Sequence, residues 1–256
     1  MHRRVLPVTV AVPVLFGLVF SMAAVAQSPA ESPGKEPVKT SLSAWSAIAN
    51  LPDFVGVWEV TRNRGGGQPA PISLTPQYQA MQKAYQANPP QDNPSANCVP
   101  PGMPGIMGQP YPIEFLFTPG KVTIVIEAYM QVRHIYTDGR KHPDDPDLTY
   151  NGNSIGRWEG DTLVVDSVGF TPDTPLAAQG VRHSSKMHIL ERMRLQDANT
   201  LVITTTIDDA EALGRPFTRT TTFARHRDWT TAEYICQQNN RNFVDEKGKA
   251  GINLTR

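Results

Sequence analysis

The sequence has little of what marks several common protein classes. Only 2 of its 256 residues are cysteine, too few for a structural zinc site or a disulfide-rich scaffold. Neither sign of charge is in excess, since 24 basic residues balance 24 acidic ones, whereas a nucleic-acid-binding surface needs a basic surplus. Aromatic residues make up 8% of the chain, yet hydrophobic residues reach 39%, enough for a packed core. We therefore expect a folded protein with no nucleic-acid partner.

Motifs for a hydrolase nucleophile and for common cofactors are also missing. The sequence contains no Gly-x-Ser-x-Gly elbow, no phosphate-binding glycine loop and no dinucleotide fingerprint. Its histidines show neither a His-x-His pair nor a His-Glu-x-x-His pattern, so their spacing does not favour a metal site. We expect no cofactor and no bound metal.

The most apolar stretch of the chain lies near its start. Residues 5–20 are largely apolar, follow two arginines, and precede Ala24-Val25-Ala26, a small-residue cleavage pattern. These features predict that residues 1–26 are a signal peptide and that the exported protein is periplasmic or secreted. No later segment is long and apolar enough to span a membrane, so none is expected after cleavage.

The remaining chain is predicted to form one domain behind a short leader. Residues 27–50 are rich in Ser, Ala, Pro and Lys, which indicates a flexible leader, and residues 51–256 form the predicted domain. A proline at a helix start and side chains at helical spacing predict one short helix over residues 76–86. Dense proline and glycine over residues 88–112 predict a long irregular loop.

Short strand-like runs separated by turn residues occupy most of the domain. Connections of two to five residues favour antiparallel neighbours, and a meander of this size closes into a barrel or packs as two sheets. We predict an all-β, up-and-down antiparallel barrel of nine or ten strands, with a β-sandwich as the alternative. The expected strands are residues 53–62, 113–117, 122–129, 131–137, 154–159, 162–170, 187–195, 201–207, 217–225 and 233–236.

The two cysteines, Cys98 and Cys236, are expected to meet an oxidising compartment after export. One disulfide between them is the economical arrangement, because it would tie the Pro-rich loop to the C-terminal segment. Neither cysteine belongs to a Cys-x-x-Cys pair, so thiol–disulfide oxidoreductase activity is not expected.

Gly56-Val57-Trp58, on the first predicted strand, resembles the Gly-x-Trp signature of the calycin superfamily, the lipocalins and their relatives. The resemblance implies a calycin-like barrel whose base is plugged by the Trp, with Arg219 or Arg225 covering it. Residues 136–140 (Tyr-Thr-Asp-Gly-Arg) and 158–166 (Trp-Glu-Gly-Asp-Thr-Leu-Val-Val-Asp) are similar to blocks of uncharacterised secreted bacterial proteins. That second resemblance implies no mechanism and no catalytic residues.

Glu191 is the ionisable residue that stands out on an apolar strand face. Alternation along residues 187–195 places it beside methionine, isoleucine and leucine side chains, hence toward the interior. An inward carboxylate either pairs with a cation such as Arg133 or has a raised pKa, as a general base near neutral pH requires. Both interpretations, catalytic base and structural ion pair, stay open.

His134 and Tyr136 share one face of another predicted strand, which leads into Asp138, Arg140 and His142. A histidine can shuttle protons, and a tyrosine can donate a hydrogen bond to a developing oxyanion. The row could therefore bind and polarise a carbonyl or hydroxyl group. The alternative is that it faces solvent and that Asp138 serves only the turn.

Two further residues are catalytic candidates. Asp166 lies on a strand whose faces are both apolar, so its direction is open and a cross-strand hydrogen bond is the alternative. His183 follows a loop that could lie at the barrel mouth, where it could also be an ordinary loop histidine. The candidates for binding a substrate are Arg133, Arg140, Trp158 and His142.

The leading functional hypothesis is a secreted enzyme that acts on a hydrophobic small molecule inside the barrel. Isomerisation, elimination or hydration would proceed by cofactor-independent acid–base chemistry, with Glu191 as base and His134 and Tyr136 assisting. One rival is a non-catalytic, lipocalin-like carrier that uses the same cavity. Another is a secreted hydrolase that uses His134 or His183.

Overall fold

A computed structural model describes residues 42–61, 71–90, 94–239, 242–244, 246 and 250–252. The predicted signal peptide and most of the predicted leader lie outside these residues. The chain divides into one unit over residues 1–39 and a second over residues 40–256, and the elements described below all belong to the second. None of the helices in the described ranges combines the length and apolarity needed to cross a membrane.

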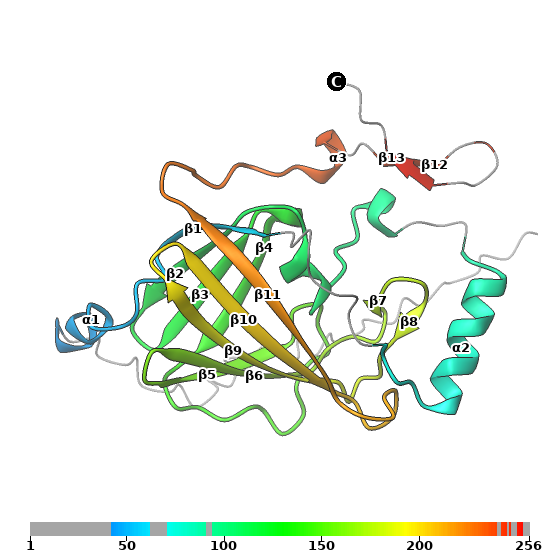
Figure 1. The fold of residues 1–256 in the computed structure, drawn as a ribbon, viewed down its shortest axis with the longest axis horizontal. Helices are drawn as coiled ribbons and strands as arrows, with labels where there is room; N and C mark the ends of the chain where they lie inside the picture. The colour runs from blue at the N-terminus through cyan, green and yellow to red at the C-terminus, as the bar shows by residue number, and fades with distance from the viewer. Residues whose placement is uncertain are drawn as a thin grey trace, which may run out of the picture. The chain divides into compact units, whose positions relative to one another are not determined.

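Nine strands of the second unit close into a barrel (Figure 1). The predicted all-β barrel is therefore confirmed, and the sandwich alternative is wrong. Several wall strands alternate between core and surface, as in β3, where every second residue is buried. Around the wall the order is β1 (Gly56–Val60), β11 (Phe217–His226), β10 (Thr200–Asp208), β9 (His188–Asp197), β6 (Thr162–Val168), β5 (Asn153–Glu159), β4 (Gln131–Tyr136), β3 (Lys121–Ile126) and β2 (Ile113–Thr118).

One pair of neighbours departs from the predicted antiparallel meander. Strands β4 and β5 run parallel, with Ile135 opposite Ser154 and Tyr136 opposite Ile155, whereas the other wall pairs are antiparallel. A parallel neighbour requires the chain to return to the end where the first strand began, and residues 137–152 make that return. The predicted antiparallel meander rested on connections of two to five residues, and the connection between these two strands is longer.

The elements outside the barrel wall agree only in part with the prediction from the sequence. Helix α2 (Pro76–Ala87) confirms the predicted helix, while α1 (Leu42–Ile48) lies in the stretch assigned to the leader. Residues 233–235 form no strand, so the predicted last strand is wrong. The elements that were not predicted are the hairpin of β7 (Pro175–Ala177) and β8 (Val181–Arg182), the C-terminal α3 (Cys236–Asn239), β12 (Asn242–Val244) and β13 (Ala250–Ile252), and the short 3-10 turns η1 (Pro94–Asn97), η2 (Gly105–Gly108) and η3 (Ala128–Met130).

One end of the barrel is closed by Trp58. Its side chain is fully buried, and its indole Nε1 donates a hydrogen bond to the carbonyl of Phe54 at 2.9 Å. The guanidinium of Arg225 lies 4.4 Å from the centre of the Trp58 ring and pairs with the carboxylate of Asp53 at 2.8 Å. Of the two arginines proposed to cover Trp58, it is Arg225 that does so.

The opposite end, where β11 begins, is covered by the Pro/Gly-rich loop. Met103, Ile106 and Met107 of this loop are buried in the main hydrophobic core. Arg219, near the start of β11, donates from Nη2 to the carbonyl of Pro104 at 2.8 Å. A disulfide joins Cys98, just before this loop segment, to Cys236, which confirms the predicted bond.

Candidate functional site

Inside the barrel, Glu191 and Arg133 form a buried ion pair. Nη2 of Arg133 lies 2.5 Å from Oε2 of Glu191, and each side chain is only 1% exposed. The hydroxyls of Ser154 and Ser167 accept further hydrogen bonds from Arg133, at 3.3 and 3.0 Å. These two serines had not been singled out in the sequence, because a serine on a strand gives no signal of a buried partner.

The barrel wall separates Glu191 from His134 and Tyr136, the groups proposed to assist it. Arg133 and Ile135 of β4 are buried, while His134 between them is exposed on the outer face with Tyr136. A base held in a buried ion pair must break that pair before it accepts a proton, and breaking such a pair is strongly unfavourable. The geometry is that of the structural ion pair, the alternative role considered for Glu191.

An open pocket of about 390 Å³ lies on the outer wall, where β4 and β5 run parallel. Small-molecule sites commonly have volumes of about 300–1,000 Å³. The lining contains three side-chain amides and two phenol rings, and no Asp, Glu, Lys or Arg. Its residues are Gln131, Val132, His134, Tyr136, Thr149, Tyr150, Asn151, Gly152, Asn153 and Ser154.

His134 is the titratable imidazole of this pocket. Nδ1 of its ring lies 3.3 Å from the hydroxyl of Thr123 on the neighbouring strand. Partial burial and the positive charge of Lys121 both lower the pKa of His134 below its ordinary value. The ring is therefore neutral at pH 7 and able to accept a hydrogen bond or a proton.

Asn151 supplies the most specific hydrogen-bonding group in the pocket. Its Nδ2 donates to Oε1 of Gln131 at 3.1 Å. Its Oδ1 is buried and accepts no hydrogen bond within the described part of the chain. A buried acceptor without a donor is unfavourable by about 1–3 kcal/mol, so this atom favours a ligand that brings a hydroxyl or an N–H.

Arg140 lies beside the pocket but is not free to bind an anion there. Its guanidinium carbon is 3.8 Å from the centre of the Tyr136 ring, and its Nη2 is 2.6 Å from Oδ2 of Asp138. Hydrogen bonding from Arg140 lowers the pKa of the Asp138 carboxyl, which stays ionised and neutralises the arginine. Asp138 thus holds Arg140 rather than joining His134 and Tyr136 as a third catalytic group.

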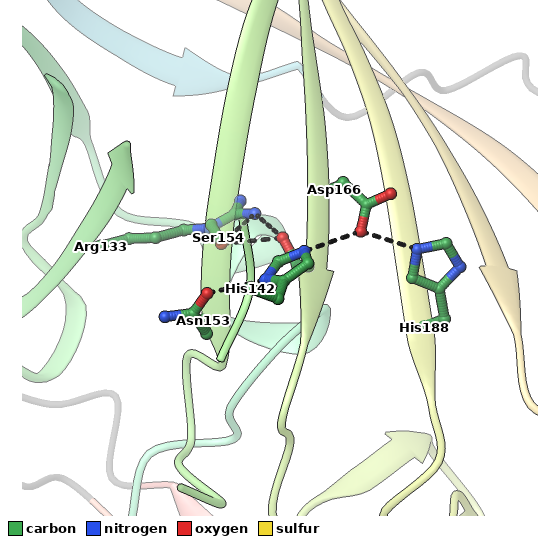
Figure 2. A network of polar contacts seen from close by, with 7 residues as sticks. Arg133, His142, Asn153, Ser154, Asp166 and His188 are labelled. Carbon is green, nitrogen blue, oxygen red and sulfur yellow. Dashed lines mark hydrogen bonds and ion pairs between the residues drawn. The ribbon is translucent and has the colours of Figure 1, made fainter. Parts of the chain in front are cut away.

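His142 and Asp166 meet on the outer wall next to the pocket (Figure 2). Oδ1 of Asp166 lies 3.0 Å from Nε2 of His142 and 2.9 Å from Nε2 of His188. Figure 2 shows the two imidazole rings approaching this one oxygen from different sides. His142 is carried by the connection between β4 and β5, so the parallel pairing brings it to Asp166 on β6.

Asn153 links this cluster to the pocket. Nδ1 of His142 lies 2.7 Å from Oδ1 of Asn153, and Asn153 lines the pocket. A carboxylate that accepts from Nε2 fixes the tautomer and orientation of an imidazole.

Across the residues that the structure describes, no group of three or more His, Cys, Asp or Glu side chains is arranged to hold a metal ion.

His188 was not among the predicted site residues. Alternation along β9 places it on the outer face, opposite to Glu191. Its pairing with Asp166 depends on β6 and β9 being neighbours, although the β7–β8 hairpin separates them in sequence. Ionisable residues at outward positions of the strands were the available signal. They indicate a cluster only when it is known which strands are neighbours.

The last two candidates lie apart from the pocket. His183 is buried, and its Nδ1 lies 2.8 Å from the carbonyl oxygen of Ser184 while its Nε2 lies 3.0 Å from the hydroxyl of Thr174. Trp158 packs edge-on against Phe54 and Phe117, with ring centres 5.5 and 6.0 Å away. Both are engaged in packing or hydrogen bonding within the described part of the protein.

Comparison with known proteins identifies no family. No protein-family model matches the chain, and no curated protein matches it. One solved structure that matches is a secretary abundant heat soluble (SAHS) protein from Ramazzottius varieornatus, with 10% identity and a TM-score of 0.34. The match covers 68% of this chain and 96% of that chain.

Proposed function

We propose that this protein binds a small, uncharged, partly polar molecule in the pocket on the outer wall of β4 and β5. The observation that carries the proposal is the buried, unpartnered Oδ1 of Asn151 in the pocket lining. The absence of Asp, Glu, Lys and Arg from that lining favours a neutral ligand. Amides both donate and accept hydrogen bonds, and tyrosine rings offer apolar faces, which suits a molecule with several hydroxyl or carbonyl groups.

The predicted signal peptide and the disulfide both support an exported protein. A disulfide persists in oxidising compartments and is rare in a reducing cytosol. A periplasmic or secreted protein would meet such ligands outside the cytoplasm. We therefore place the proposed binding activity in the periplasm or the medium.

Binding can be tested with a panel of uncharged monosaccharides and polyols on the full chain, with straight-chain alcohols of similar size as apolar probes. We expect at least one hydroxylated probe to raise the melting temperature and to give a binding isotherm by calorimetry. Asn151→Leu should weaken that binding at least tenfold, about 1.4 kcal/mol, because the acceptor for the ligand is lost.

Gln196→Leu provides a matched control, because it replaces an exposed amide near the end of β9 that does not line the pocket. This variant should bind as the unmodified protein does. The proposal fails if no hydroxylated probe binds, or if Asn151→Leu binds as tightly as the control.

Proton transfer to the bound molecule is a second candidate function. The specific observation is the carboxylate of Asp166 shared by two histidines, one of which contacts Asn153 in the pocket. A histidine oriented by a carboxylate is a common general base, and Nδ1 of His142 would take this role once it is released from Asn153. Conversion of a bound probe, followed by mass spectrometry, would support this role, whereas binding without conversion identifies a carrier.

A further inference from the structure

The segment that follows β11 runs along the outer wall to the disulfide (Figure 1), and we call its residues 227–236 the strap. The hydroxyl of Thr231 donates to the carboxylate of Glu114 on β2 at 3.3 Å. The backbone amide of Ala232 donates to the carboxylate of Glu127, which follows β3, at 2.9 Å. No backbone–backbone hydrogen bond joins the strap to the wall within the described residues, so side chains and the disulfide hold it in place.

The strap packs against a strained turn between β3 and β4. Tyr129 and Met130 have φ angles of 58° and 49°, a left-handed conformation that is unfavourable for residues other than glycine. The ring centre of Tyr234 lies 5.7 Å from that of Tyr129, and the backbone amide of Tyr234 donates to the sulfur of Met130 at 3.4 Å. Strained backbone persists only where its surroundings hold it, and the strap forms part of those surroundings.

This turn leads directly into the pocket proposed to bind the ligand. Gln131 follows Met130, and its Nε2 donates to the carbonyl oxygen of Tyr129 at 3.3 Å. Its Oε1 accepts from Nδ2 of Asn151 at 3.1 Å. The same Nδ2 donates to the carbonyl of Val132 at 3.4 Å, so both acceptors of the Asn151 amide come directly after the turn. A shift of the turn would therefore reorient the buried Oδ1 of Asn151.

The disulfide fixes the end of the strap that contacts the turn. Cys236 lies two residues after Tyr234, and its partner is Cys98. Both cysteines are partly exposed, so a thiol reductant can reach the bond. Once the bond is open, only a few hydrogen bonds and ring contacts hold the strap, which makes local opening more frequent.

We propose that the strap positions Gln131 and Asn151 for ligand binding and that the disulfide locks the strap, so that reducing this bond weakens binding in the pocket. The inference rests on the proposed function, because it describes a control of the same site. A dithiol supplies two electrons and two protons: the S–S bond breaks, two cysteine thiols form, and the dithiol closes to a disulfide. Tyr234 is a positioning residue here, since it contacts the turn and does not line the pocket.

The first test compares the oxidised full chain with the same chain reduced by dithiothreitol. In isotope-labelled protein, the side-chain amide signals of Gln131 and Asn151 should shift on reduction, while that of the exposed Gln196 on β9 stays unchanged. Calorimetry with glucose, xylitol and glycerol measures binding. We expect any of these probes that binds the oxidised chain to bind the reduced chain at least fivefold more weakly. Circular dichroism verifies that both forms are folded.

Variants of the strap separate its positioning role from the covalent bond. Tyr234→Ala keeps the disulfide but removes the ring contact with Tyr129, and it should cause the same signal shifts and the same loss of affinity. Tyr234→Phe keeps the ring and should bind as the unmodified protein does. Trp229→Ala is the matched control, because Trp229 stacks on His226 at the opposite end of the strap, with ring centres 3.6 Å apart.

The outcomes for the pocket and for the strap are distinguishable. If no probe binds the oxidised chain, the proposed function fails, and the amide signals alone decide whether the strap positions these side chains. Where a probe does bind, an equal affinity in all forms or unchanged amide signals would each overturn the strap proposal, while the pocket proposal stands. Equal effects of Trp229→Ala and Tyr234→Ala would also overturn it. If the reduced chain unfolds, the two Tyr234 variants decide the question.

Discussion

Ser154 and Ser167 show how small polar side chains allow charge inside an apolar barrel. Their hydroxyls lie 2.8 Å apart, and both accept hydrogen bonds from Arg133. Without them the guanidinium would depend on Glu191 alone, and a buried ion pair needs such additional hydrogen bonds to offset its lost hydration. The ion pair and the two serines are therefore one structural unit.

His183 is expected to make the stability of the fold depend on pH. Burial lowers the pKa of His183 below its ordinary value of 6.5, so the unfolded chain takes up the proton more readily than the folded one. The stability contributed by the neutral ring is thus complete above about pH 6.5 and is lost as the pH falls through the folded-state pKa.

Urea unfolding between pH 7.5 and pH 5 measures this effect. The decline in the free energy of unfolding should be shallower in His183→Gln, which cannot take up the proton. An equally steep decline in the variant would show that other groups cause it.

Some features of single residues could be predicted from the sequence. Alternation along β9 predicts an inward Glu191, and the structure has this side chain buried because period-two patterning is a local property. Glu191 pairs with Arg133, and Asp166 contacts two histidines. Both sets of contacts join segments that lie far apart in the sequence. Such contacts depend on strand order, which the pattern of one strand does not contain.

At the scale of elements, turn residues and alternation were sufficient to find the wall strands. They were insufficient for the β7–β8 hairpin, whose strands of three and two residues are too short to show a period. The parallel β4–β5 pair was not predicted, because short connections favour antiparallel neighbours and the prediction extended this rule to the longer connection between these two strands. The supposed strand at residues 233–236 had a suitable composition but finds no open edge in a closed barrel.

The disulfide is expected to be the largest single stabiliser of the loop that covers the barrel. It closes a chain segment with a sequence separation of 138, and the chain-entropy relation gives about 5 kcal/mol for a loop of that length. A Cys98→Ala/Cys236→Ala double variant should lose stability up to this amount in urea unfolding. Reduction of the unmodified protein is the matched comparison, and an unchanged free energy of unfolding in both would contradict the expectation.

At the scale of the whole molecule, the barrel is closed by strand pairs of very different length. Strands β9 and β10 are joined by nine register pairs, whereas β4 and β5 are joined by two. The β4–β5 seam also borders the proposed binding pocket. Local opening is most frequent where few backbone hydrogen bonds and contacts hold an element.

We therefore expect amide hydrogen exchange to be faster at this seam than in β9 and β10. The amides of Ser154 and Ile155 are the ones to follow, with those of Ile203 and Thr205 as internal references. A ligand bound in the pocket should slow exchange at the seam and leave the references unchanged. Uniform protection around the wall would contradict this view of the barrel.

The return connection over residues 137–152 has a consequence for how the molecule can diversify. Both of its ends are fixed by wall strands, and Thr149 forms a bridge to Phe170, whereas residues 138–148 take no part in strand pairing. Insertions or exchanges in residues 138–148 would alter the position of His142 beside the pocket while the strand register stays intact. An engineer seeking new ligand preferences should randomise this connection first, since it tolerates change that the wall does not.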